Sequence, residues 1–554
     1  MSQASIIVRD PIAASALSTP VAVTTWPRAA AYAIFAVLAA VILLTFGDYG
    51  ISWDEWLQNT YGLKLLDYYT SGLEDEAAFE FVNLFLYGGF FDMLAAILNL
   101  VSPFGEYATR HLLGGMIFLS GLVGGWKLAR LLAGERAGLI ALICLATTPL
   151  LYGHGFINPK DSPLAWFAIW TTYFACRLME PGRPTWKTVV GFGVSLGLTV
   201  GTRVIGVVYI DYFVAVLAIA AGSRMIMGEP WQAQAARMKA SALAVGVIVL
   251  IAFVVMAFFW PWSVQEPLNL VAALRSFAHF AFYPLVLWNG ELIRADHMPH
   301  SYLPGLIVLQ LPEYILLGLA AASISAVIVW RRRILTLFAE PRAQQYLFVV
   351  AAGTAPIVGY VLFDPTIYNG LRHFLFVVPP LVILGAIGLD RLLSVVEGKH
   401  RTAGLILAGV LALAALRQTV LMARLHPYEY VSYNSFVGGV TGATNRFELD
   451  YWGTSLAESA RALGAVITKD PSLGLTTGVP AKVFACGDRT SAENFLPHGA
   501  VWTGVLAEAD FYMGMTGVPC EGYEKPGKIV VEIKRLGVVI GYVRDLRHPW
   551  GRRP

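Results

Sequence analysis

Two adjacent carboxylates, Asp54 and Glu55, stand in the polar segment GDYGISWDEW that follows the first long apolar run. Neighbouring residues on a helix point to different faces, so one carboxylate can face a cavity while the other caps or pairs locally. A partly desolvated carboxylate beside an acceptor hydroxyl is what a general base requires. The alternative is that the pair supplies an acidic N-cap to a helix that begins near Trp56.

The segment GHGFINPKDSPLA brings three further polar side chains, Asn158, Lys160 and Asp161, into a loop too short to form a domain. Pro159 and Pro163 stiffen this loop. Asp161 can join the catalytic carboxylates, or it can be the N-cap of the helix that follows. A lysine is unexpected here, because the outward loops contain few of them, and its charge suits a bound phosphate.

Three more basic side chains fall at the outer ends of apolar runs: Arg203, and Arg372 with His373 in the segment DPTIYNGLRHF. Fixed cations in a dry site stabilise the negative charge that develops on a phosphate-bearing leaving group. The alternative is that each arginine pairs structurally with a nearby acid such as Asp211 or Asp364. We predict that the cations converge on one outward-facing cavity.

Tyr302 and Asn158 are the uncharged side chains that we place in this cavity. Tyr302 belongs to a set of aromatics typical of membrane interfaces, a few of which can line a lipid or sugar groove. It follows the segment HMPHS, in which His297 and His300, with Asp296, are ligand types of a metal site. A proline between the histidines argues against a helix that would align them, so we predict loop hydrogen bonding instead. The sequence predicts no metal site and no certain cofactor, and it leaves a divalent cation open.

The composition of the chain indicates the class of protein that holds these residues. Of 554 residues, 56% are hydrophobic and 14% are charged, and the formal net charge is +3. A soluble protein carries about 25% charged residues, and so small a net charge is not typical of a nucleic-acid-binding protein. The composition therefore excludes a soluble enzyme, a disordered chain and a nucleic-acid partner, and it places most of the chain in a lipid bilayer.

Eleven apolar runs are candidates for helices that cross the roughly 30 Å hydrocarbon layer of a bilayer. They lie near residues 29–46, 108–128, 137–153, 163–180, 188–202, 204–222, 240–262, 304–330, 344–363, 373–393 and 402–421. The fifth and sixth runs form one stretch that is basic at both ends. We therefore predict two short spans, with Arg203 at the turn between them.

The distribution of Lys and Arg predicts the topology. These residues gather on alternate connecting segments, which under the positive-inside rule puts the N-terminal segment 1–28 in the cytoplasm. The membrane domain is predicted to cover 29–424, with outer loops at 47–107 and 263–303 that contain interfacial helices. An odd number of spans places the tail, 425–554, outside. An amphipathic helix at 455–463 and the strand-like runs AKVFAC, KIVVEIKR and VVIGYVRD predict a small α/β domain there.

Cys486 and Cys520 in the tail are predicted to form a disulfide, because the topology puts both in an oxidising compartment. The alternative is that they are two separate packing cysteines.

The motifs, taken in order, resemble a known architecture. The acidic pair, NPKDSP, LRHFLFVVPP, HPYEYVSYN and ELDYWGTS are similar to segments of bacterial glycosyltransferases that use phospholipid carriers. Over residues 29–460 the chain resembles the glycosyltransferase C superfamily, nearest to the protein O-mannosyltransferases and the bacterial transferase that adds aminoarabinose to lipid A. Two features depart from the family pattern: there is no metal-binding D-x-D motif, and the tail matches no catalytic module.

This resemblance implies inverting transfer of a sugar from a polyprenyl-phosphate carrier to a hydroxyl of a lipid, glycan or protein. It implies a multi-pass protein in contact with the lipids of the bacterial inner membrane, with its site at the outer face. It matches Asp54 to the catalytic acid, Glu55 to its companion and Asp161 to the second-loop acid, and makes Arg203 and Arg372 candidates for holding the lipid phosphate.

Two other functional classes fit part of the pattern. A transporter or flippase of lipid-linked sugars also has polar residues near the ends of its spans, and a non-catalytic assembly or receptor protein is the third hypothesis. The ionisable residues cluster at the outer ends and no second half mirrors the first, whereas transporters bind near the midplane and often have paired halves. The pattern therefore favours the transferase.

Overall fold

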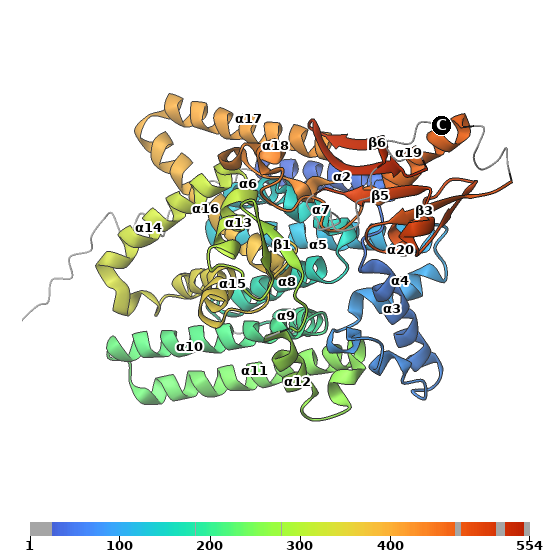
Figure 1. Cartoon of the computed structure of the whole chain (residues 1–554). Coiled ribbons are helices and arrows are strands. Elements are labelled where there is room, and N and C mark those ends of the chain that lie inside the picture. Colours follow the sequence, from blue (N-terminus) through green and yellow to red (C-terminus); the bar gives the residue numbers. More distant parts are fainter. Residues whose placement is uncertain (1–24, 183, 279, 471–477, 517–526, 548–554) are drawn as a thin grey trace, which may run out of the picture.

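A computed structural model describes residues 25–182, 184–278, 280–470, 478–516 and 527–547. Most of them are helical, and Figure 1 shows a bundle of long helices with a small sheet at one end. The helices up to residue 259 are α2 (Trp26–Thr45), α3 (Glu55–Thr70), α4 (Phe90–Asn99), α5 (Glu106–Ala133), α6 (Glu135–Ala146), α7 (Pro149–Ile157), α8 (Asp161–Leu178), α9 (Trp186–Val200), α10 (Val208–Ile226) and α11 (Trp231–Phe259). The later helices are α12 (Asn269–Ala278), α13 (Tyr302–Gln310), α14 (Glu313–Leu337), α15 (Pro341–Phe363), α16 (Val378–Lys399), α17 (Arg401–Leu425), α18 (Gly439–Ala443), α19 (Ser455–Lys469) and α20 (Arg489–Glu493).

Seven helical segments in the described part of the chain are long and apolar enough to cross a membrane, or up to nine if each of two bent pairs is one span. The bent pairs are α6 with α7, at 61°, and α13 with α14, at 115°. All eleven predicted runs are helical. Two of them, α8 and α9, do not count as spans. Helix α9 is too short, with only 15 residues. The protein is a polytopic α-helical membrane protein, as predicted, with a smaller number of clear spans.

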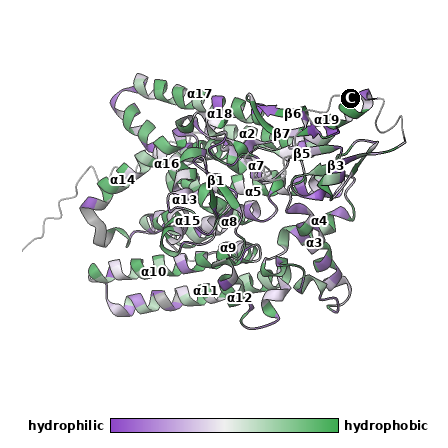
Figure 2. Cartoon of the chain, in the orientation of Figure 1, coloured by the Kyte–Doolittle hydropathy of each residue, from purple (hydrophilic) through white to green (hydrophobic). Residues whose placement is uncertain are grey.

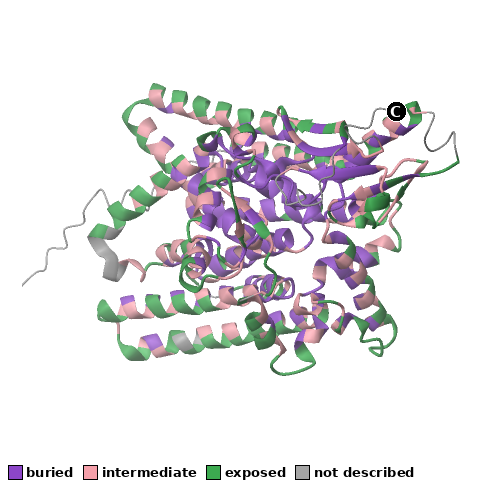
Figure 3. Ribbon diagram, viewed as in Figure 1, coloured by how far each residue is buried: buried purple, intermediate pink, exposed green. Residues whose placement is uncertain are grey.

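The outer helices expose apolar side chains. On α11, Leu250 and Phe253 are exposed, and on α17 Leu405 and Leu413 are. Figure 2 shows hydrophobic residues along the outer helices, and Figure 3 shows that these helices are largely exposed while buried residues gather in the middle of the molecule. Apolar surface on this scale is unfavourable in water, so these faces are the ones that contact lipid.

Glycines allow the inner helices to approach closely, as is usual where helices pack inside a bilayer. Between α14 and α16, a Cβ on Gly388 would lie 1.9 Å from the carbonyl oxygen of Gly318. Between α5 and α8, a Cβ on Gly121 would lie 2.2 Å from the ring of Trp166. Neither position has room for a side chain, so these glycines fix the spacing of the helices that carry the loops.

Both of the loops that were predicted to lie outside the membrane are structured. The first contains α3 and α4, which confirms the prediction of helices there. The second contains α12 and a hairpin that was not predicted, β1 (Leu285–Trp288) with β2 (Glu291–Arg294). The turn is Asn289–Gly290, and both residues have positive φ, at 51° and 91°. An Asn-Gly pair favours this type of two-residue turn, so the sequence did contain the signal.

The tail contains a five-stranded mixed sheet with the order β4-β3-β5-β7-β6. Its strands are β3 (Ala481–Ala485), β4 (Ala500–Trp502), β5 (Phe511–Met515), β6 (Lys528–Arg535) and β7 (Val538–Asp545). The predicted helix and three predicted strand-like runs correspond to α19, β3, β6 and β7. The buried central strand β5 was not predicted. Helix α19 packs on the sheet through Leu456 and Leu463, which confirms a small α/β domain.

The segment between α17 and α19 packs with the membrane helices. Tyr430, Tyr451 and Trp452 are buried in the same core cluster as the residues of α5, α8 and α16. The separate core of the sheet begins at Leu456. Residues 426–454 therefore lie against the loops that carry the candidate site, although they follow the last span.

Candidate active site

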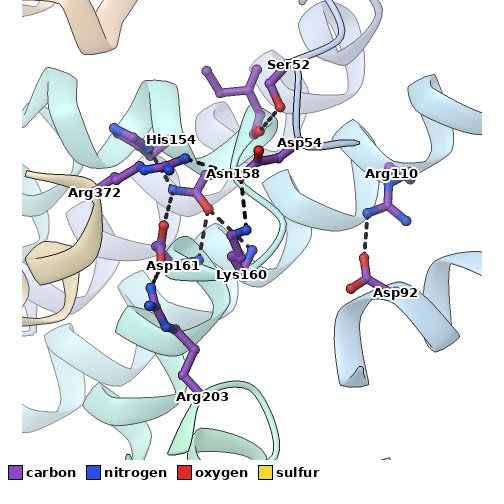
Figure 4. A network of polar contacts seen from close by, with 11 residues as sticks. Ser52, Asp54, Asp92, Arg110, His154, Asn158, Lys160, Asp161, Arg203 and Arg372 are labelled. Atoms are coloured by element: carbon purple, nitrogen blue, oxygen red, sulfur yellow. Dashed lines mark hydrogen bonds and ion pairs between the residues drawn. The ribbon is translucent and has the colours of Figure 1, made fainter. Parts of the chain in front are cut away.

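Asp54 occupies the N-cap position of α3, directly before Glu55, but its side chain makes no capping hydrogen bond. The carboxylate forms ion pairs with Lys160, whose Nζ lies 2.9 Å away, and with Arg372, whose Nη1 lies 3.2 Å away. Figure 4 shows Asp54 beside Lys160 and Arg372, which come from two other loops. The side chain is still 27% exposed, so an incoming acceptor group can reach it.

Glu55 points elsewhere. Its carboxylate accepts a hydrogen bond from the backbone N–H of Ser52 at 2.7 Å and lies 3.2 Å from Nε2 of His111 on α5. The side chain is buried. The two carboxylates therefore diverge, as expected for helix neighbours, and Glu55 holds the turn that presents Asp54.

The loop between α7 and α8 carries the second set of polar residues. Lys160 is the N-cap residue of α8, and Asp161 is its first helical residue. The carboxylate of Asp161 pairs with Arg203 and accepts a hydrogen bond of 3.1 Å from the side-chain amide of Asn158. The ammonium group of Lys160 lies 5.0 Å from the centre of the Tyr87 ring. Asp161 is thus an ion-pair partner and not an N-cap.

Arg372 is the first residue of η6 (Arg372–Val377). Its guanidinium lies over the rings of Tyr368 and Trp452, 4.9 and 4.7 Å from their centres. Stacking of this kind holds the plane of the guanidinium and leaves its N–H groups free to point outward from the edge. Its Nε is buried without a hydrogen-bond partner among the described residues. Arg372 therefore has donors to spare for an anion.

Arg203 lies in the predicted break, between α9 and η4 (Val204–Val207). Its guanidinium faces the rings of Tyr87 and Phe277, at 5.5 and 5.7 Å. Among the described residues, Arg203 pairs with Asp161 and Arg372 pairs with Asp54. Neither arginine pairs with Asp211 or Asp364 in the described part of the chain. The structural pairing that the sequence left as an alternative therefore takes place inside the site itself.

His373 and Tyr302 contact the loop that precedes Arg372. The His373 ring packs edge-on against Tyr368, with 4.5 Å between the ring centres. The hydroxyl of buried Tyr302 accepts a hydrogen bond of 3.1 Å from the backbone N–H of Gly370. These contacts support the loop that carries Arg372, and a direct role of either residue in binding stays a prediction.

The electrostatic balance of the cluster favours an anion. Lys160, Arg203 and Arg372 supply three positive charges and Asp54 and Asp161 two negative ones, so the positive charges of these five residues exceed the negative ones by one. Burial by itself would raise the pKa of Asp54, but the two cations beside it outweigh this effect and lower the pKa to about 2. Burial opposes the charge of Lys160, yet Asp54 raises its pKa overall. Both groups are ionised at neutral pH.

The described residues contain no group of three or more His, Cys, Asp and Glu side chains that could hold a metal ion. In the histidine segment, the Asp296 carboxylate is engaged by Arg294, whose Nε lies 2.8 Å away, and by His297 at 2.9 Å.

Sequence reasoning assigned no role to several residues that complete the site. The rings of Tyr87, Tyr368 and Trp452 lie beside the three cations. His154 contacts Asn158, and Tyr451 contacts His154. Trp452 and Tyr451 belong to ELDYWGTS, a motif that contributed only to the family resemblance. Their chemistry was not apparent because an aromatic ring becomes a cation-binding surface only when the fold places a cation over it.

The predicted disulfide stays a prediction, because Cys520 lies outside the described residues.

Comparison with known proteins gives one family match. Residues 112–262, less than half of the chain, match the model of the family described as dolichyl-phosphate-mannose-protein mannosyltransferase. This range contains Asn158, Lys160, Asp161 and Arg203. No curated protein sequence matches the chain.

Solved structures match over most of the chain at low similarity. ArnT from Cupriavidus metallidurans in the apo state has a TM-score of 0.48 and 13% identity, covering 93% of this chain and 98% of that one. The same protein bound to undecaprenyl phosphate gives 0.48 and 12%, covering 94% and 98%. The Archaeoglobus fulgidus oligosaccharyltransferase tethered with an acceptor peptide gives 0.48 and 12%, covering 88% and 65%. At this level of similarity we draw no functional argument from them.

The family match covers helices and loops that supply four of the nine candidate site residues. Over the residues that the family model covers, the match agrees with the resemblance to the protein O-mannosyltransferases that the sequence indicated.

Proposed function

We propose that this protein is an inverting glycosyltransferase that moves a sugar from a polyprenyl-phosphate carrier to a hydroxyl acceptor on a lipid, glycan or protein. The observation that carries the proposal is the contact of Asp54, an accessible carboxylate, with Lys160 and Arg372, next to the Arg203–Asp161 pair. The matching family is named for a lipid-phosphate sugar donor. We propose the same class of donor for this protein and leave the identity of the sugar open.

The cations are suited to the leaving group. A lipid phosphate carries charge that increases as its bond to the sugar breaks, and charge-assisted hydrogen bonds in a site sheltered from water stabilise it. Arg372 has an unpaired buried donor, and the positive charges of the five residues exceed the negative ones by one. A phosphate between Arg372, Lys160 and Arg203 neutralises that excess.

Asp54 is the proposed general base. Its low pKa makes it a weak base while the site is empty. A bound phosphate competes for Lys160 and Arg372, so the pKa of Asp54 rises toward its ordinary value when the donor is present. The acceptor oxygen then attacks the anomeric carbon from the face opposite the phosphate, a new C–O bond forms, and the bond to the phosphate breaks. The hydroxyl proton passes to Asp54, and polyprenyl phosphate leaves with the bonding electron pair.

The proposed location follows from the topology. The positive-inside pattern favours a cytoplasmic segment 1–28, a membrane domain over 29–424 and an extracytoplasmic tail over 425–554, with the site at the outer face of the bacterial inner membrane. The isoprenoid chain of the donor remains among lipids and helices while only its sugar phosphate enters the polar cluster. Tyr302, Asn158 and His373 remain candidates for the substrate cavity.

The test uses the purified full-length protein, a polyprenyl-phosphate sugar and a panel of hydroxyl acceptors, and it measures released polyprenyl phosphate and the anomeric configuration of the product. Asp54→Asn should lower kcat about 10²- to 10⁴-fold, the usual contribution of a general base. Asp67→Asn, a charge change on the exposed face of the same helix, is the matched control. Wild-type turnover by Asp54→Asn would refute the assignment of the base. Movement of the lipid across vesicles without any covalent product would favour the transporter instead.

A further inference from the structure

A chain of buried hydrogen bonds runs from Tyr451, after the last span, to Asp161 at the site. The Tyr451 hydroxyl lies 2.9 Å from Nε2 of His154, and Nδ1 of His154 lies 3.0 Å from the side-chain nitrogen of Asn158. That nitrogen also donates to the Asp161 carboxylate at 3.1 Å. All four residues are at least 98% buried.

The direction of each bond follows from Asn158. Its side-chain oxygen accepts the backbone N–H groups of Asp161 and Lys160, at 2.9 and 3.3 Å, which fixes the nitrogen as the end that faces His154. An amide nitrogen only donates, so Nδ1 of His154 accepts and carries no proton. The proton of the neutral ring is therefore on Nε2, which donates to the Tyr451 oxygen. Every bond in the chain has a defined donor and acceptor.

Tyr451 also contacts the other cation-bearing loop. A Cβ on Gly370 would lie 3.1 Å from the Tyr451 hydroxyl oxygen, so the hydroxyl rests directly on the backbone two residues before Arg372. The start of α19 fixes the segment of Tyr451 in turn, because Asp450 accepts the backbone N–H groups of Thr454 and Ser455 at 3.2 and 2.8 Å. One tyrosine thus lies between the loop of Lys160 and the loop of Arg372.

We propose that His154 and Tyr451 are positioning residues for the lipid phosphate: they orient Asn158, which orients Asp161 and through it the Arg203 guanidinium. This inference rests on the proposed function and adds two residues that do not touch the substrate. It gives the ELDYWGTS motif a role, namely to hold the cations of two distant loops at the spacing that one phosphate requires.

The experiment compares Tyr451→Phe with Tyr360→Phe. Both tyrosines are 1% exposed, and the Tyr360 hydroxyl donates to the backbone oxygen of Pro299 at 2.9 Å, in a bond that is not part of the chain of hydrogen bonds from Tyr451 to Asp161. Tyr451→Phe should raise KM for the donor about 3- to 10-fold, the range expected for loss of one hydrogen bond, and leave KM for the acceptor unchanged. Tyr360→Phe should change neither constant.

Two further variants separate positioning from general support of the fold. His154→Gln can still accept from Asn158 and donate to Tyr451, so it should keep most of the donor affinity that His154→Leu loses. Combined with Arg203→Lys, Tyr451→Phe should add little to the donor KM, because residues that act through one another are not additive.

Binding of polyprenyl phosphate, measured directly, distinguishes failure of this inference from failure of the proposed function. If wild-type protein binds the lipid but transfers no sugar, the proposed reaction is wrong. Weaker binding by Tyr451→Phe would still support the positioning role of Tyr451. Binding by Tyr451→Phe equal to that by Tyr360→Phe, or full additivity with Arg203→Lys, would overturn the inference. Wild-type protein that does not bind polyprenyl phosphate would overturn both.

Discussion

Asp54 and Arg372 are 318 positions apart in the sequence, yet the carboxylate of one lies 3.2 Å from the guanidinium of the other. The contact joins the loop before α3 to the loop before α16, and Lys160 joins a third loop to the same carboxylate at 2.9 Å. A carboxylate that serves as the counter-ion of two cations is released only when another anion takes them over. In the proposed reaction, arrival of the lipid phosphate is therefore what activates the base.

Arg372→Lys tests whether the stacked guanidinium binds the donor. Lysine keeps the charge but loses the planar set of donors and the stacking on Tyr368 and Trp452, so the substitution is not conservative here. We expect KM for the donor to rise about tenfold, equivalent to about 1.4 kcal/mol. Arg391→Lys, on the same chain segment but outside the site, is the control. An unchanged donor KM in Arg372→Lys would contradict the role of the guanidinium.

The pH dependence of the two kinetic constants should differ. The low pKa of Asp54 in the empty site keeps the base ionised as the pH falls, so kcat/KM, which reports the free enzyme, should show no acid limb from this group above about pH 3. The bound phosphate raises the pKa, so kcat should begin to fall at a higher pH than kcat/KM. Acid limbs that coincide would show that the donor does not displace Asp54 from its cations.

His426 predicts a pH-dependent contribution to stability. Its ring lies between Glu429, at 2.7 Å, and Asp48, at 3.0 Å. Burial lowers the pKa of His426, but the two carboxylates outweigh burial and raise it overall. The contribution of His426 to the free energy of unfolding is therefore fully present below its unfolded-state pKa of about 6.5. It is lost as the pH rises through the raised pKa of the folded state. The melting temperature of wild type should fall over this window relative to that of His426→Gln, whose curve should be flatter; parallel curves would contradict the prediction.

Packing of α14 against α16 should be intolerant of a single added methyl group. Gly388→Ala places a Cβ 1.9 Å from a backbone oxygen of Gly318, so the helices must separate, at a cost of about 1–3 kcal/mol. Gly398→Ala on the same helix meets nothing within 4 Å and is the control. Thermal unfolding in detergent should show a lower melting temperature for the first variant alone. Equal melting temperatures would mean that the helices can move apart freely.

The sequence by itself predicted much of the fold. Scarce charge and apolar runs of about 20 residues indicate membrane helices, because a helix satisfies its own backbone hydrogen bonds in lipid, and every predicted run is helical. The sequence also placed the break at Arg203 correctly, between α9 and η4, although α9 is too short to count as the separate span that the basic flanks predicted. The hairpin at Asn289–Gly290 and the strand β5 were not predicted, because short elements have weak patterns and depend on the surfaces that cover them.

For the candidate site, the sequence determined which side chains are expensive to place near a bilayer, and so it identified Asp54, Lys160, Asp161, Arg203 and Arg372. Only the tertiary structure decided how they pair: Asp54 with Lys160 and Arg372, and Asp161 with Arg203. The reason is physical. That a charged side chain is costly to bury follows from its residue type and is visible in the sequence. The partner that offsets this cost is fixed by helix packing between segments hundreds of residues apart.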